Sequence, residues 1–200
     1  SERRRYPNYC RALLFILGPT MMQETSFGSM NYNVLASILK SLNVVQFGAG
    51  AEIGVLYGDT SYHLLNEIPN LNLYSVDPYL PYDEPERTAH HMARYEQQAR
   101  DKLSKFGARS IMMRATSVEA APAITDGTLD FVFIDAQHTY EACKEDIATW
   151  FPKVRPGGLI TGHDYRWDGV HRAVTEFAQK MNYAGSFTPP ASDLWIFRKA

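Results

Sequence analysis

The sequence predicts a doubly wound α/β domain, in which helices cover both faces of a mainly parallel, seven-stranded sheet that ends in an antiparallel hairpin. Short apolar runs alternate with segments of helical periodicity along most of the chain, and strands separated by helices form parallel sheets. Near the C-terminus, two strand-like runs follow one another with no helix between them, which favours the hairpin. Two hundred residues, of which 45% are hydrophobic, suffice to bury the core of one such domain.

Helices are predicted where apolar residues recur every three or four positions. Pro69 and Gly107 directly follow two of these segments and mark their ends. The first helix belongs to an N-terminal helical segment, residues 1–43, which we place before the main domain at 44–200. The five predicted helices span residues 31–42, 60–68, 86–106, 141–151 and 170–181.

Strands are predicted where short apolar runs lie between turn residues. Gly48 and Gly50 interrupt the first of these runs. Pro156-Gly157-Gly158 is predicted as the turn before the fifth strand. The seven predicted strands span residues 44–55, 71–76, 110–113, 129–134, 159–161, 183–188 and 194–198.

The charge of the chain is nearly balanced, with 20 Lys and Arg against 22 Asp and Glu. Nucleic-acid-binding domains normally carry a basic excess, so we expect no nucleic-acid partner. No run approaches the ~20 apolar residues that a membrane span needs, and the short run 12–17 is interpreted as a packing segment or the remnant of a longer precursor. Cys10 and Cys143 lack metal or disulfide spacing, which is typical of reduced thiols and predicts a cytoplasmic protein.

Polar residues follow the predicted strands, at the edge of the sheet where doubly wound folds bind ligands. Gly54 and Gly58 allow a sharp turn close to a ligand after the first strand, although a plain strand-to-helix turn explains them equally well. The glycine spacing of dinucleotide-binding folds is not matched. Asp77 ends the second strand, where a carboxylate can accept the hydroxyls of a ribose. Together with the glycine turn it predicts a nucleoside site, whose adenine the common polar turn at Ser117 could reach.

A second polar group follows the fourth and fifth strands. Asp135 and His138 come after the fourth strand, and His163 and Asp164 come after the fifth. A carboxylate after so apolar a strand needs a cation or hydrogen-bond donors as partners. Two carboxylates and two imidazoles at neighbouring strand ends suggest a metal site, although each group taken alone is more often a helix cap.

Together these motifs make the chain similar to class I S-adenosylmethionine-dependent methyltransferases, which have a Rossmann-like fold. The Glu-x-Gly-x-x-x-Gly run at 52–58, Asp77 and the Pro-Gly-Gly run occupy the places expected for that class. The segments 133–141 and 163–165 are similar to the small-molecule group that contains macrocin-type sugar O-methyltransferases, and catechol O-methyltransferase is a more distant relative. The resemblance covers residues 44 to 181.

The resemblance implies a place for the cofactor and for a metal. Asp77 would bind the ribose of S-adenosylmethionine and Ser117 would lie by its adenine. Asp135, His163 and Asp164 would bind a divalent metal such as Mg²⁺ or Mn²⁺. The residues implied for the methionine part are Glu52, Gly54, Gly58 and Thr60.

Two positions depart from the metal-dependent relatives. His163 stands where those relatives keep a carboxylate, and because imidazole suits Mg²⁺ poorly, either a softer ion or a metal-free reaction is expected. His138 stands where the catechol enzyme carries its lysine base, and an imidazole can take a proton near neutral pH.

The resemblance therefore implies methyl transfer to a hydroxyl oxygen of a small polar acceptor, with Asp135 and His138 as catalytic residues and a divalent metal assisting. A homo-oligomer is left open. Two alternatives stay open at this point: a non-catalytic subunit that binds S-adenosylmethionine, and a relative of proteins associated with antibiotic-tailoring hydroxylases. The segment 78–100 is predicted either as a lid on the acceptor pocket or as a loop and helix that cover the sheet.

Overall fold

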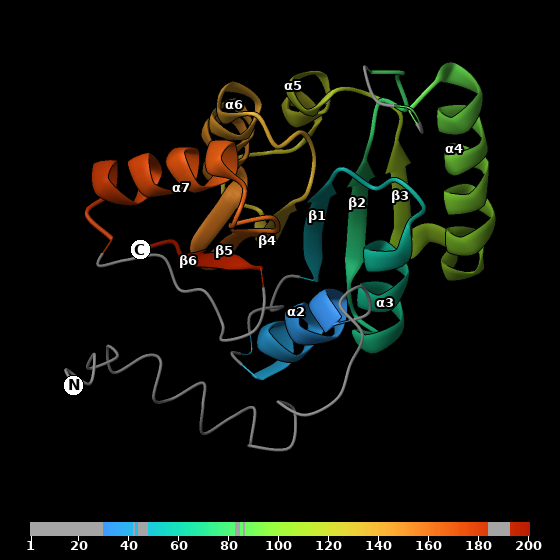
Figure 1. The fold of residues 1–200 in the computed structure, drawn as a ribbon. Coiled ribbons are helices and arrows are strands. Elements are labelled where there is room, and N and C mark those ends of the chain that lie inside the picture. The colour runs from blue at the N-terminus through green and yellow to red at the C-terminus, as the bar shows by residue number, and fades with distance from the viewer. Residues whose placement is uncertain (1–29, 42, 44–47, 83–84, 86, 184–192) are drawn as a thin grey trace, which may run out of the picture.

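A six-stranded sheet lies between two layers of helices in the part of the chain that the structure describes (Figure 1). The computed structural model describes residues 30–41, 43, 48–82, 85, 87–183 and 193–200. The strands are β1 (Ala49–Ile53), β2 (Asn72–Val76), β3 (Ser110–Met113), β4 (Leu129–Ile134), β5 (Val154–Gly162) and β6 (Trp195–Arg198). Their order in space is β3-β2-β1-β4-β5-β6, and only β6 runs antiparallel to its neighbour. The predicted α/β class and mainly parallel sheet are confirmed.

The helices cover both faces of this sheet (Figure 1). They are α2 (Met30–Ser41), α3 (Asp59–Glu67), α4 (Ala89–Leu103), α5 (Ser117–Ala120), α6 (Tyr140–Trp150) and α7 (Asp168–Lys180). Alternate residues of β4 serve the two layers, as a strand requires. Val132 and Ile134 belong to the core shared with α6 and α7, whereas Phe131 and Phe133 belong to the core shared with α2 and α3. None of the helices described is both long and apolar enough to cross a membrane.

Three of the helices begin at a threonine whose side chain caps the first turn. Thr88, Thr116 and Thr139 precede α4, α5 and α6, and each hydroxyl accepts a hydrogen bond from a backbone N–H of the helix that follows. Such caps satisfy one of the N–H groups that the first turn leaves unpaired. The sequence analysis missed α5, which at four residues is too short to show helical periodicity.

The predicted turn at 156–158 is wrong, because β5 runs straight through it. Gly157 adopts a left-handed φ of 75°, and the pairing with β4 shifts register between Leu129 and Phe131. The backbone N–H of Gly157 donates to Lys199 O (2.8 Å), and that of Lys199 donates to Gly158 O (2.9 Å). The glycines therefore form a bulge that continues the strand and pairs with the end of the chain.

The described sheet has six strands, whereas seven were predicted. The antiparallel strand β6 pairs with β5. Tyr183 lies outside any strand, and the rest of the predicted strand 183–188 falls outside the described residues, as do residues 44–47 of the first one.

A buried ion pair joins the N-terminal ends of three strands. Asp130 is fully buried, and its carboxylate accepts hydrogen bonds from the backbone N–H of Gly48 (2.8 Å) and of Ala49 (3.2 Å). Its other oxygen accepts from Nε of Arg155 (2.8 Å), whose side chain is also buried. Since each partner satisfies a charge or donor that water cannot reach, this ion pair ties the starts of β1, β4 and β5 together.

Candidate active site

A cavity of about 570 Å³ opens at the carboxyl ends of β1, β2 and β4. Parallel strands of a doubly wound sheet direct their following loops to this edge, which is where ligands bind in such folds. The lining comes from the turn after β1, the segment after β2, the turn before α5, the segment after β4 and the first turns of α6.

Glu52 of β1 contributes a buried carboxyl group to this cavity. It accepts hydrogen bonds from the hydroxyls of Ser61 and Thr60, and Ser61 lies 2.7 Å from the Ser75 hydroxyl. Burial raises the pKa of the Glu52 carboxyl to about 8, even though the hydroxyls favour its ionised form. Glu52 is therefore protonated at neutral pH while no cation lies beside it.

This burial predicts a pH dependence of folding. Because the carboxyl binds its proton more tightly in the folded chain than in the unfolded one, stability that is complete below pH 4.5 is lost as pH rises toward 8. Between pH 6 and 8 the loss due to this group is about 2 kcal/mol. Glu52→Gln should flatten the urea-derived stability profile over that range by this amount. An unchanged slope in the variant would contradict the prediction.

The two glycines of the turn have different surroundings. Gly54 has a φ of 90°, and a Cβ atom there would lie 2.1 Å from the carbonyl oxygen of Asp135, so this position brings the β1 turn into backbone contact with the end of β4. Gly58 begins α3 with a φ of 75°. A Cβ atom on it would face Ala99 of α4 at 3.2 Å, and Gly58 is outside the cavity lining.

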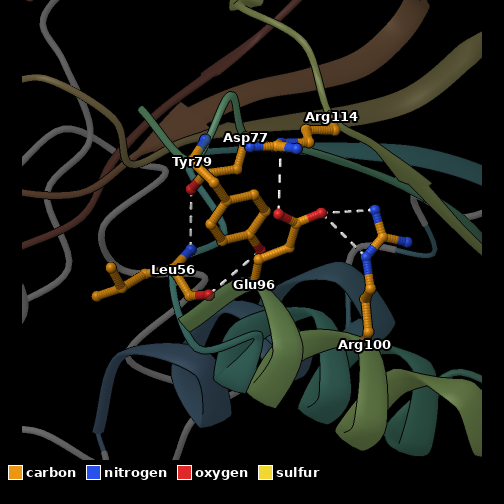
Figure 2. Close-up of polar contacts among 6 residues, drawn as sticks. All are labelled: Leu56, Asp77, Tyr79, Glu96, Arg100 and Arg114. Atoms are coloured by element: carbon orange, nitrogen blue, oxygen red, sulfur yellow. Dashed lines mark hydrogen bonds and ion pairs between the residues drawn. The ribbon is translucent and has the colours of Figure 1, made fainter. Parts of the chain in front are cut away.

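Asp77 holds the turn after β1 in place (Figure 2). Its Oδ2 accepts from the backbone N–H of Val55 (2.9 Å) and of Leu56 (3.0 Å), and its Oδ1 accepts from the N–H of Tyr79 (2.8 Å). A carboxylate offers about four acceptor positions, so these bonds leave roughly one for a ligand hydroxyl. Leu56, in this turn, has a left-handed φ of 48°.

The segment after Asp77 is fixed to the same turn and to α4. The hydroxyl of the buried Tyr79 donates to Leu56 O (3.2 Å), as Figure 2 shows. Glu96 of α4 accepts from Arg100 (2.7 Å) and pairs with Arg114 after β3 (3.3 Å). The Glu96–Arg114 pair ties α4 to the carboxyl end of β3.

Only part of the segment 78–100 lines the cavity. Its lining residues are Pro78, Leu80, Pro81, Tyr82, Arg87 and Met92. Its two histidines, His90 and His91, do not line the cavity. Residues 83, 84 and 86 lie outside the described part of the chain, so the lid stays a prediction.

Ser117 lies in the cavity wall at the start of α5. Its Oγ accepts from the indole N–H of Trp150 (2.8 Å), and the hydroxyl also hydrogen-bonds Asp146 of α6. Burial raises the pKa of Asp146 to about 6. The sequence analysis missed Asp146 and its neighbour Glu145 as cavity residues. The available signal was an acidic residue on the same helical face as Cys143 and Trp150.

The four polar groups predicted after β4 and β5 do come together. His138 Nε2 lies 2.7 Å from Asp164 Oδ2, and His163 Nδ1 lies 3.2 Å from Asp164 Oδ1. The distance from His163 Nδ1 to Asp135 Oδ1 is 3.8 Å. Asp164 has a φ of 57°, a conformation that aspartate tolerates better than most residues. It places the carboxylate between the two imidazoles.

The electrostatics of this cluster follow from its geometry. Hydrogen bonding to Asp164 raises the pKa of His138. Burial opposes ionisation of Asp164, but the two histidines outweigh burial and hold the pKa of Asp164 well below its usual range. Burial raises the pKa of Asp135 to about 6. The arrangement suits a histidine that takes up a proton beside a carboxylate that stays ionised.

The same side chains can also hold a divalent ion. Ligand atoms of Asp135, His138 and Asp164 lie within 4.8 Å of one another, and so do those of His163, Asp164 and Asp193. Two carboxylates with one imidazole suit Mn²⁺, Fe²⁺ or Zn²⁺ better than Mg²⁺. The three predicted ligands are divided between these groups, with Asp135 and Asp164 in one and His163 and Asp164 in the other, and His138 and Asp193 are further candidate ligands.

Comparison with solved structures shows the fold. The O-methyltransferase NovP is 16% identical, with 96% of this chain and 98% of that chain covered and a TM-score of 0.64. The calicheamicin methyltransferase CalS11 is 13% identical, with 98% and 94% covered and a TM-score of 0.64. The cofactor-bound protein Rv0187 from MTB is 17% identical, with 94% and 88% covered and a TM-score of 0.59.

Sequence comparison adds one short match and one family. Protein y4gI of Sinorhizobium fredii, described as uncharacterized, is 34% identical over 55 residues, which are 28% of this chain and 6% of that protein. This chain thus spans a small fraction of that relative's length. The family model described as "Methyltransferase domain" matches residues 51–165, which are more than half of the chain and run from within β1 to beyond the end of β5. The chain belongs to this methyltransferase domain family.

Proposed function

We propose that this protein transfers the methyl group of S-adenosylmethionine to a hydroxyl oxygen of a small polar acceptor. The main observation that supports this proposal is the excess of acidic side chains in the cavity lining. Six carboxyl side chains line it against a single guanidinium, that of Arg87; they are Glu52, Asp59, Asp77, Asp135, Glu145 and Asp146. S-adenosylmethionine carries a sulfonium and an ammonium group, and a poorly solvated carboxylate attracts such cations strongly.

The cavity residues divide into parts that fit the cofactor. Asp77 is proposed to accept a ribose hydroxyl with its remaining acceptor position, and Ser117 to lie by the adenine. The methionine part falls to Glu52, Gly54 and Thr60, all of which line the cavity. Gly58 supports this turn from outside. When bound, the cofactor supplies an electrophilic methyl group on a sulfonium.

His138 is proposed as the general base. Its Nε2 bonds Asp164, which leaves Nδ1 as the ring nitrogen that takes the proton of the acceptor hydroxyl. Asp164 orients the imidazole and stabilises the imidazolium that forms, as a buried carboxylate does in other histidine bases. The sulfonium and the acceptor oxygen must be aligned for an in-line displacement, which the cavity walls enforce.

A divalent ion is a second way for the cluster to activate the acceptor. Asp135 and Asp164 would hold it together with His163 or His138, and as a Lewis acid it would lower the pKa of the acceptor hydroxyl. An ion bound through His138 would remove this imidazole from its role as base. The two schemes therefore predict different responses to a chelator.

Calorimetry with S-adenosylmethionine tests the cofactor part. Asp77→Ala should weaken binding at least roughly tenfold, because a buried hydrogen bond to a charged group contributes roughly 1.5–3 kcal/mol and the turn also loses its support. Asp101→Asn is the matched control, since Asp101 is an exposed aspartate of α4 outside the cavity lining. Equal affinities of the two variants would contradict the proposed site. Binding without cofactor consumption across a panel of catechols and sugars would favour a non-catalytic subunit.

A further inference from the structure

Exposed apolar side chains gather at the candidate active site. Among the described residues five large hydrophobic side chains are exposed. Leu80, Tyr82 and Val118 line the cavity, and Trp167 is 58% exposed with its ring centroid 5.2 Å from that of His138. Met181, the fifth, lies at the opposite end of α7. Single exposed apolar residues are ordinary, but a group of them around a polar cavity indicates a ligand-binding surface.

Trp167 occupies a position where a smaller polar residue would stabilise the fold better. It is the N-cap of α7, with φ −72° and ψ 131°, and its side chain makes no capping hydrogen bond. The corresponding positions of α4, α5 and α6 hold threonines that do cap. Because Trp167 makes no capping hydrogen bond and leaves its indole exposed, it contributes little to the stability of the fold. This favours a role for Trp167 in binding.

The backbone that carries the indole is fixed beside the His138 cluster. The backbone N–H of Trp167 donates to Asp164 O (2.9 Å). Gly169 fits against the turn before α6 so closely that a Cβ atom on it would lie 2.4 Å from His138 O. An aromatic side chain has few rotatable bonds, so on a fixed backbone it loses little conformational entropy when a ligand packs on it.

From these observations we infer that Trp167 binds the methyl acceptor, with the flat apolar face of an acceptor ring packed on the indole and the ring hydroxyl directed to His138. The inference rests on the proposed function and deepens it. It assigns the acceptor to ring compounds, and both an aromatic diol and a sugar offer such a face.

Fluorescence quenching tests this contact without turnover. The chain has three tryptophans, of which Trp150 and Trp195 are fully buried, so acrylamide quenching reports mainly on Trp167. With S-adenosylhomocysteine present, catechol or methyl glucoside should lower the quenching constant about twofold or more at saturation, and the more effective probe identifies the ring type. Absence of protection by both probes would overturn the inference. Protection that grows with protein concentration alone would also overturn it, because a second copy would then cover the indole.

Substitution gives the second test. Trp167→Thr should raise the KM for the protecting acceptor roughly tenfold, leave S-adenosylmethionine affinity unchanged, and raise Tm by roughly 2–4 °C because it restores a cap. Trp167→Phe should keep most of the acceptor affinity, and Met181→Ala should change none of these quantities. An unchanged KM in Trp167→Thr would overturn this inference but not the proposed function. Failure of the unmodified protein to bind S-adenosylmethionine would instead overturn the proposed function on which it rests.

Discussion

Replacing His138 with alanine is expected to lower turnover by roughly 10²–10⁴-fold, because the acceptor hydroxyl then loses its proton acceptor. Affinity for S-adenosylmethionine should change little, since His138 bonds Asp164, whereas the cofactor contacts are proposed for Asp77 and the turn after β1. Steady-state kinetics with calorimetry separates the two quantities. His171→Ala is a suitable control, because His171 lies on α7 outside the cavity lining.

Removal of metal ions with a chelator distinguishes a metal-free reaction with His138 as base from a reaction that requires a divalent ion. If His138 acts as a base without metal, dialysis against EDTA should leave activity intact and the His138→Ala loss unchanged. If an ion is required, EDTA should abolish activity and Mn²⁺ should restore it better than Mg²⁺, as an imidazole ligand implies. A His138→Ala variant that keeps more than about a tenth of wild-type turnover would exclude the general-base role.

Replacing Asp130 with alanine is expected to lower the free energy of unfolding by about 3–5 kcal/mol, because the buried guanidinium of Arg155 and two backbone N–H groups lose their acceptor. Urea denaturation followed by circular dichroism measures this loss. Asp126→Ala is the matched control, because Asp126 forms an exposed pair with Lys153 near the same end of the sheet, and its loss should cost at most about 1 kcal/mol.

The two variants also test where the stability of the sheet resides. A similar, small effect of both substitutions would show that the Asp130–Arg155 pair is replaceable by water and that the strand ends are held by their backbone pairing alone. Neither residue lines the cavity, so at temperatures where the protein stays folded the cofactor affinity should be the same in both variants.

Much of the fold could be predicted from the sequence because the strands are short apolar runs between turn residues. β3 and β4 match the predicted ranges residue for residue, and the alternation with helices gave the parallel order. The course of β5 could not be predicted from the residues of the strand itself. It depends on Gly157 pairing with Lys199 at the other end of the chain, and a Pro-Gly-Gly run that forms a bulge is indistinguishable in sequence from one that forms a turn.

The candidate site could likewise be predicted from the sequence only in part. The meeting of Asp135, His138, His163 and Asp164 followed from the rule that parallel strands end at one edge. Which imidazole bonds which carboxylate oxygen depends on the left-handed φ of Asp164, which no sequence pattern shows. Likewise, no sequence pattern shows that three backbone amides, those of Val55, Leu56 and Tyr79, converge on Asp77.

The contact between Gly54 and the carbonyl of Asp135 limits how this enzyme scaffold can be changed. Any larger residue at position 54 would push apart the turn proposed for the cofactor and the strand end that carries the proposed reacting groups, so it would weaken cofactor binding and turnover together. Altered acceptor preference is therefore more accessible to selection, or to an engineer, at Trp167 beside His138. Its exposed side chain can vary without disturbing the cofactor turn, whereas Gly169, which packs against His138, cannot.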